Sequence, residues 1–154
     1  MVSLAQPKVR AFSVTRRISN ETQRYVTVAS LLSILFFTFH LTDDIVRGME
    51  PGTLSNLTAV PILVIWLYGT LVLAERRSGY VIILLGSLLG LVVPVIHMKG
   101  AGVGGAIAKS NGAFFFIWTL LALGVTGLFS VILSARGLWE QLTRRTAEQH
   151  KQGA

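Results

Sequence analysis

The sequence predicts an all-α integral membrane protein, built as a bundle of four transmembrane helices with both termini in the cytoplasm. The first indication is composition: of 154 residues, 52% are hydrophobic and only 14% are charged. A soluble domain carries roughly 25% charged residues because its surface faces water. The second is a set of four long apolar stretches, and the third is the uneven placement of Lys and Arg between them. Much of the surface is therefore expected to face lipid.

The four apolar stretches are long enough to cross a bilayer as helices. They cover residues 25–41, 58–74, 80–96 and 113–135, with 17 to 23 residues each. A helix needs roughly 20 residues to cross a hydrocarbon core of about 30 Å, so we expect the shorter stretches to extend by a turn. None alternates strictly between apolar and polar residues, and an open sheet edge is not satisfied in lipid. The transmembrane domain is therefore predicted over residues 25–135.

The placement of Lys and Arg predicts the orientation. Eleven of the fourteen lie before the first stretch, between the second and third, or after the fourth. Only Arg47, Lys99 and Lys109 lie on the other side. Because cytoplasmic segments collect Lys and Arg, we expect residues 1–24 to form a basic cytoplasmic tail. Residues 136–154 are expected to form a second cytoplasmic tail, amphipathic if it is helical.

The N-terminal segment leaves two compartments open. Residues 1–19 contain four basic residues and no acidic one, a composition that also suits a mitochondrial presequence. A retained tail obeys the orientation rule without a further signal. We therefore expect a bacterial cytoplasmic membrane, with the mitochondrial inner membrane as the alternative. Nucleic acid is not an expected partner, because the basic residues do not form a stripe with interleaved aromatics.

Two absences from the sequence restrict the chemistry. There is no cysteine, which excludes disulfides, thiolate metal sites and cysteine nucleophiles. None of the four stretches has Asp, Glu, Lys or Arg in its middle. Ion-coupled transporters usually need such a residue near the bilayer midplane. Coupled transport by a site inside this chain is therefore disfavoured, whereas passive permeation is not.

The most informative polar residues follow the first stretch, on the predicted outer side. Gly48 is a suitable C-cap, so the first helix should continue to Arg47. His40, Asp43, Asp44 and Arg47 then fall within an arc of roughly 100° on that helix. Four ionisable side chains are thus expected to share one helix face.

A further histidine, His97, ends the third stretch at the same predicted level. Gly86 and Gly90 lie on the same helical line and form a GxxxG pattern, which lets another helix approach closely. If that face packs inward, His97 points into the bundle. It is then expected to meet the polar face of the first helix.

Several kinds of site suit these residues. His40 and Asp44, one turn apart, can bind a divalent metal such as zinc, iron or manganese, with His97 as a third ligand. The same groups can act as a general base with an orienting carboxylate, and Arg47 can hold a phosphate or carboxylate. Alternatively, Asp43 and Asp44 pair with nearby cations at a hydrated helix end, and the cluster is structural.

The loop over residues 98–109 is rich in glycine. No strand precedes it and no GK[ST] ending follows, so a nucleotide site is not expected. A flexible outer loop is the expected structure. The alternative is a lid of small residues folded over the His and Asp cluster.

Three classes of function remain open. The preferred one is an accessory or scaffold subunit that binds other membrane helices through its small-residue faces. The second is a membrane enzyme or a ligand- or metal-binding protein that uses the outer-face residues. The third is an oligomeric channel or carrier. The expected partners are the lipid bilayer and other membrane subunits or further copies of this chain.

Overall fold

A computed structural model describes residues 6–50, 52–98, 103 and 105–152 of the chain. These residues contain no strand, which confirms the all-helical prediction for the part described. Lys99 and much of the glycine-rich loop lie outside the described residues. The elements are α1 Gln6–Val46, the 3-10 helix η1 Leu54–Thr58, α2 Ala59–Leu71, α3 Arg77–His97, the 3-10 helix η2 Ala106–Lys109, and α4 Ala113–Gln152.

Three of the helices are long and apolar enough to cross a membrane. They contribute the segments Glu21–Val46 of α1, Arg77–His97 and Ala113–Thr146 of α4. The fourth apolar helix, α2, has only 13 residues and ends three residues before the predicted boundary at residue 74. The described bundle therefore consists of three helices of transmembrane length and one shorter apolar helix.

The early end of α2 follows from the tight turn that joins it to α3. A Cβ atom on Gly79 would lie 1.9 Å from the carbonyl oxygen of Leu73. Only glycine allows the chain to fold back so closely on the first turn of α3. The turn therefore requires α2 to end before the apolar sequence does.

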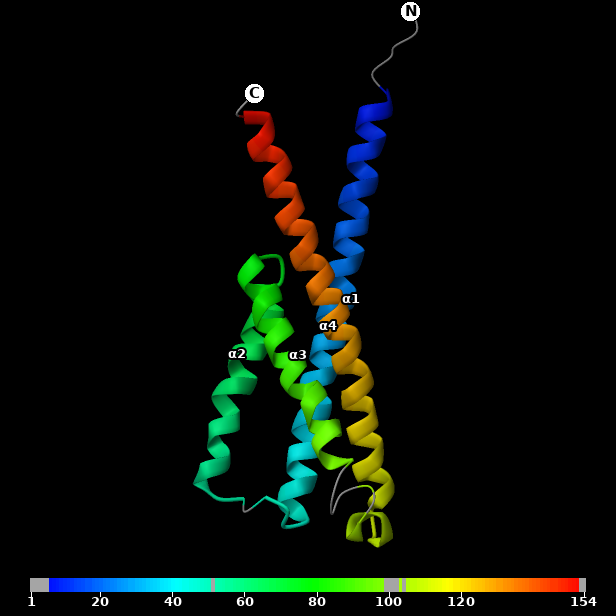
Figure 1. Ribbon diagram of the computed structural model, residues 1–154, viewed down its shortest axis with the longest axis vertical. Helices are drawn as coiled ribbons and strands as arrows, with labels where there is room; N and C mark the ends of the chain where they lie inside the picture. The colour runs from blue at the N-terminus through cyan, green and yellow to red at the C-terminus, as the bar shows by residue number, and fades with distance from the viewer. Residues whose placement is uncertain (1–5, 51, 99–102, 104, 153–154) are drawn as a thin grey trace, which may run out of the picture.

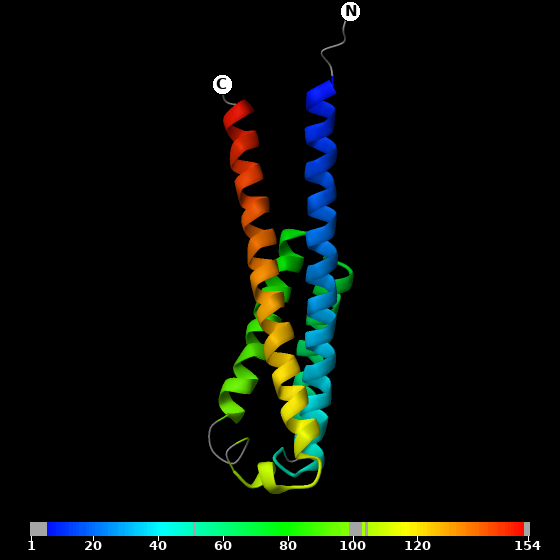
Figure 2. The same cartoon turned by 90° about the vertical axis from the view of Figure 1, so that its right-hand side faces the viewer.

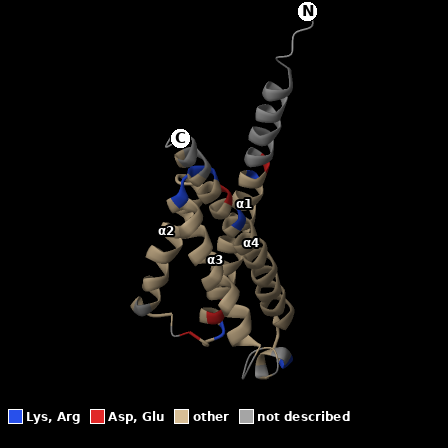
Figure 3. Cartoon of the chain, turned by 45° about the horizontal axis from the view of Figure 1, so that its top comes forward, with Lys and Arg blue, Asp and Glu red and all other residues tan. Residues whose placement is uncertain are grey.

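Helices α1 and α4 run antiparallel and side by side, as both Figure 1 and Figure 2 show. The shorter α2–α3 hairpin packs against this pair, and both chain ends lie at the same end of the molecule (Figure 1). Helix α1 continues through the predicted basic tail, and α4 continues without a break into the predicted amphipathic tail. Lys, Arg, Asp and Glu lie outside the apolar stretches or close to their ends, and the middles of those stretches carry none (Figure 3).

Small residues and hydroxyl groups hold the helices together. The indole Nε1 of Trp66 on α2 donates a hydrogen bond of 2.9 Å to Ser30 Oγ on α1. Ser87 on α3 donates a hydrogen bond of 2.6 Å to Ser130 on α4. Such interhelical hydrogen bonds between buried side chains are typical of helices that pack in lipid, where apolar burial does not drive association.

Gly86 of α3 lies directly against the Trp66 ring of α2. A Cβ atom on Gly86 would lie 2.4 Å from the Trp66 ring, and one on Gly90 would lie 3.2 Å from Leu123 of α4. The missing side chain at Gly86 therefore makes the space that the indole fills, while the one at Gly90 admits α4. This packing fixes the rotation of α3 about its own axis.

The Gly86→Ala substitution should destabilise the fold by about 1–3 kcal/mol, because the added methyl group overpacks the contact with Trp66. We expect a lower midpoint of thermal unfolding in detergent, followed by circular dichroism. Gly127→Ala is the matched control. Its Cβ would meet its nearest neighbour, Ser87 O, at an ordinary 3.5 Å. Equal midpoints for the two variants would contradict the packing described.

Candidate metal centre

His40, Asp44 and His97 converge at the end of the bundle opposite the chain termini. His40 and Asp44 lie one turn apart near the end of α1, and His97 is the last residue of α3. Asp44 Oδ2 lies 3.6 Å from His40 Nε2 and 3.3 Å from His97 Nε2. One ligand atom from each of the three lies within 4.8 Å of the others. Donor atoms bound to one tetrahedral zinc ion lie roughly 3.4 Å apart, so small side-chain adjustments suffice to bind an ion.

Two of the three side chains are almost completely buried. His40 is 2% exposed and Asp44 is 5% exposed. Both ring nitrogens of His40 and Oδ1 of Asp44 have no hydrogen-bond partner among the described residues. A buried polar group without a partner costs about 1–3 kcal/mol. Three such atoms in one cluster indicate a place where a bound ligand supplies the missing contacts.

The third side chain, His97, is oriented by the backbone of its own helix. Its Nδ1 lies 2.9 Å from the carbonyl oxygen of Val93. A carbonyl oxygen only accepts hydrogen bonds, so Nδ1 carries the proton in the neutral ring. The lone pair of Nε2 then faces the Asp44 carboxylate. Metal-binding histidines are commonly held in this way, with the nitrogen away from the metal donating to a carbonyl group.

Phe116 of α4 forms an apolar wall beside the two imidazoles. Its ring centroid lies 5.0 Å from that of His40 and 5.8 Å from that of His97, and its side chain is fully buried. The two imidazole centroids are 4.8 Å apart. Phe116 is not among the site residues predicted from the sequence. The available signal was an aromatic residue one turn into the fourth stretch, at the predicted level of His40 and His97.

Arg47 and Asp43 lie next to the three-residue cluster but form a separate interaction. Arg47 Nε donates a hydrogen bond of 2.7 Å to Asp43 Oδ2. Its two other nitrogens donate to Ser110 Oγ, to the carbonyl oxygen of Asn111 and to that of Gly112. All three guanidinium nitrogens therefore have protein partners. Arg47 ties the end of α1 to the start of α4, and Asp43 makes the ion pair that the structural interpretation expected of it.

Gly112, whose carbonyl oxygen accepts a hydrogen bond from Arg47, occupies a position where the backbone conformation requires glycine. Gly112 has a φ of +78°, in the left-handed region, and a Cβ there would lie 2.8 Å from Arg47 Nη2. The described residues of the loop before Gly112 lie over Phe116 and over the end of α3. Ile107 is 8% exposed and packs with Phe116, and the Val103 N–H donates to the carbonyl oxygen of His97. The apolar wall of the cluster is thus covered from the loop side.

Two imidazole nitrogens and one carboxylate oxygen form a donor set suited to zinc, iron(II) or manganese. Among the described residues, His40, Asp44 and His97 are the group arranged to hold such an ion. Comparisons with protein-family models, with curated proteins and with solved structures found no match to this chain.

The tether predicts that Arg47→Lys destabilises the bundle although it keeps the charge. A lysine ammonium is a point charge on a flexible stem and does not reproduce the planar fork that contacts three loop residues. We expect a loss of about 1–3 kcal/mol, together with faster amide hydrogen exchange at residues 110–116. Arg145→Lys, at an exposed position of α4, is the control. Unchanged exchange in Arg47→Lys would show that the tether does not hold the loop.

Proposed function

We propose that the protein crosses a membrane four times with both termini in the cytoplasm, and that it binds a divalent transition metal at the opposite face. His40, Asp44 and His97 are the proposed ligands. The uneven distribution of Lys and Arg supports the orientation. The position of both chain ends at one end of the bundle supports an even number of crossings (Figure 1).

The shorter α2 counts as a crossing in this proposal. With the preceding turn, the apolar segment runs over Asn56–Leu71, which spans about 24 Å at 1.5 Å per residue. This is about 6 Å less than a typical hydrocarbon core. Local thinning of the bilayer and polar residues at the helix ends accommodate such a mismatch at modest cost.

The observation that carries the metal proposal is the set of unpartnered buried atoms. Asp44 brings a carboxylate to two imidazoles, and the His97 nitrogen nearest to it presents a lone pair in the neutral ring. Two acceptors at 3.3 Å repel each other unless a cation or a proton lies between them. A divalent metal satisfies the carboxylate and both imidazoles at once. Three protein ligands leave a fourth position of a tetrahedral ion for water or a substrate.

A scaffold role is the second candidate, and one observation favours it. The three ligands come from α1 and α3, so an ion bound there joins the ends of two helices that are far apart in the sequence. A metal used in this way stabilises the bundle that partner helices recognise. The scaffold role predicts loss of assembly on metal removal. A catalytic role predicts intact assembly with loss of turnover.

The metal proposal is tested by stoichiometry. The chain is purified in detergent, stripped with a chelator and dialysed against zinc, iron(II) or manganese, and bound metal is measured by elemental mass spectrometry. We expect about one ion per chain with at least one of these metals. His40→Ala and His97→Ala should each weaken binding by on the order of 100-fold, because even residues behind a metal ligand contribute 10- to 100-fold.

His150→Ala is the matched control, since it removes a histidine near the far end of α4. It should bind metal like the unaltered chain. Asp44→Asn removes the negative charge of the side chain but keeps its size. This variant should lose metal binding while retaining its helical content. Equal binding by His40→Ala and His150→Ala, or no binding of any of the three metals, would refute the proposed site.

A further inference from the structure

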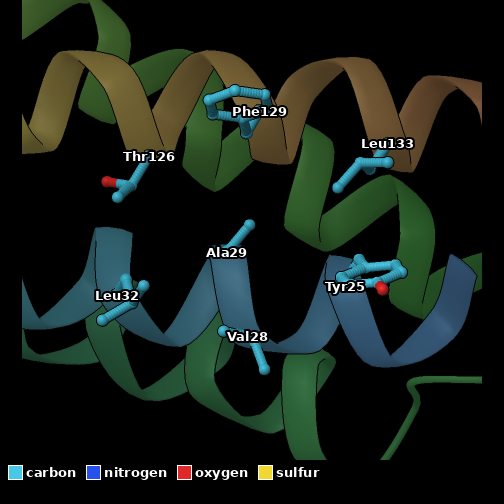
Figure 4. Close-up of a pocket in the computed structure, with 7 residues that line it drawn as sticks. All are labelled: Tyr25, Val28, Ala29, Leu32, Thr126, Phe129 and Leu133. Carbon is cyan, nitrogen blue, oxygen red and sulfur yellow. The ribbon is translucent and has the colours of Figure 1, made fainter. Parts of the chain in front are cut away.

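An apolar groove runs between α1 and α4 on the half of the bundle nearer the chain termini. Its volume is about 400 Å³, and Figure 4 shows the residues that line it. The hydroxyl of Thr126 donates to the carbonyl oxygen of Ala122 within α4, so it is not free in the groove. The lining residues are Tyr25, Val28, Ala29, Leu32, Thr126, Phe129 and Leu133.

The groove exists because small residues lie between larger ones. Ala29 points from α1 toward α4, and its short side chain leaves the space beside Phe129 open (Figure 4). Leu32 faces Thr126 at one end of the groove, and Tyr25 faces Leu133 at the other (Figure 4). The groove is therefore elongated along the helix axis, like a slot for a chain.

Two charged residues, Glu21 and Arg24, lie at the end of the groove nearer the chain termini. A second hollow of about 190 Å³ is lined by Glu21, Arg24, Tyr25 and Val28. It shares Tyr25 and Val28 with the apolar groove, so the two form one continuous surface. Glu21 and Arg24 are exposed, and neither makes an ion pair or hydrogen bond with any side chain that the structure describes. A cation and an anion that have no partner among the described side chains thus lie beside the end of the apolar groove.

The size and the charges select the occupant. A groove of about 400 Å³ has room for a single acyl chain, and the bilayer supplies acyl chains at this depth if α1 and α4 cross it. A headgroup with both a phosphate and an amine matches Arg24 and Glu21.

We propose that this surface binds one zwitterionic phospholipid, with an acyl chain between α1 and α4, its phosphate at Arg24 and its amine at Glu21. Tyr25 lies between the two regions, where an amphipathic ring suits the border of headgroup and hydrocarbon. The proposal rests on the membrane crossing proposed above and is independent of the metal site. In the proposed orientation, the lipid belongs to the cytoplasmic leaflet.

The test uses the purified full chain, delipidated in detergent and mixed with phosphatidylethanolamine or phosphatidylglycerol of the same acyl composition. Native mass spectrometry counts the lipids retained. We expect one phosphatidylethanolamine per chain, held at least 5-fold more strongly than phosphatidylglycerol. Ala29→Phe should reduce its retention at least 10-fold by filling the groove. Ala135→Phe, the same change at an exposed position outside the groove, should retain it.

The exposed headgroup position gives a second variant that leaves helix packing intact. Arg24→Glu should lose retention by at least 10-fold, whereas Arg145→Glu at an exposed position of α4 should not. Equal retention by Ala29→Phe and Ala135→Phe would overturn the proposal. Stronger binding of phosphatidylglycerol would do so too, as would a lipid-free dimer that Ala29→Phe dissociates.

Discussion

The buried Asp44 carboxylate imposes the strongest constraint on this structure. It lies 5% exposed between two imidazoles, at the end of a bundle whose apolar stretches carry no charged residue in their middles. Removing an ionised carboxylate from water costs several kcal/mol unless a partner compensates for it. Three neighbouring contacts surround this carboxylate and its imidazoles. The Val93 carbonyl orients His97, the Phe116 ring packs beside both imidazoles, and Arg47 holds the start of α4 against α1.

The His40, Asp44 and His97 cluster and the apolar groove divide the bundle into two halves with different chemistry. At the cluster end, aromatic and polar side chains pack closely and loop residues cover them. At the terminal end, α1 and α4 leave an apolar groove with Glu21 and Arg24 at its mouth. Between them, hydroxyl groups and glycines hold α2 and α3 in place. The glycine contacts set the rotation of α3 and thereby the direction in which His97 points.

Hydropathy and charge alone predict the helical class and the apolar segments of α1, α3 and α4, because lipid requires long apolar helices. They do not predict that α1 begins at Gln6 within the basic tail, or that α4 continues without a break to Gln152. The short α2 was not predictable, since its end depends on the contact between Gly79 and the Leu73 carbonyl. Helical periodicity places His40 and Asp44 on one face, and the structure brings His97 beside them. Helical spacing does not reveal that Arg47 is occupied, because its partners Ser110, Asn111 and Gly112 come from a loop more than 60 residues away.

The most direct test of the metal assignment is X-ray absorption spectroscopy of the zinc-loaded chain. Zinc held by His40, Asp44 and His97 should give a first shell of nitrogen and oxygen at about 2.0–2.1 Å, with no sulfur and with the outer-shell scattering of two imidazoles. In the His97→Ala chain, the contribution of one imidazole should disappear while the other remains. A spectrum without imidazole scattering, or one that His97→Ala leaves unchanged, would rule out this set of ligands.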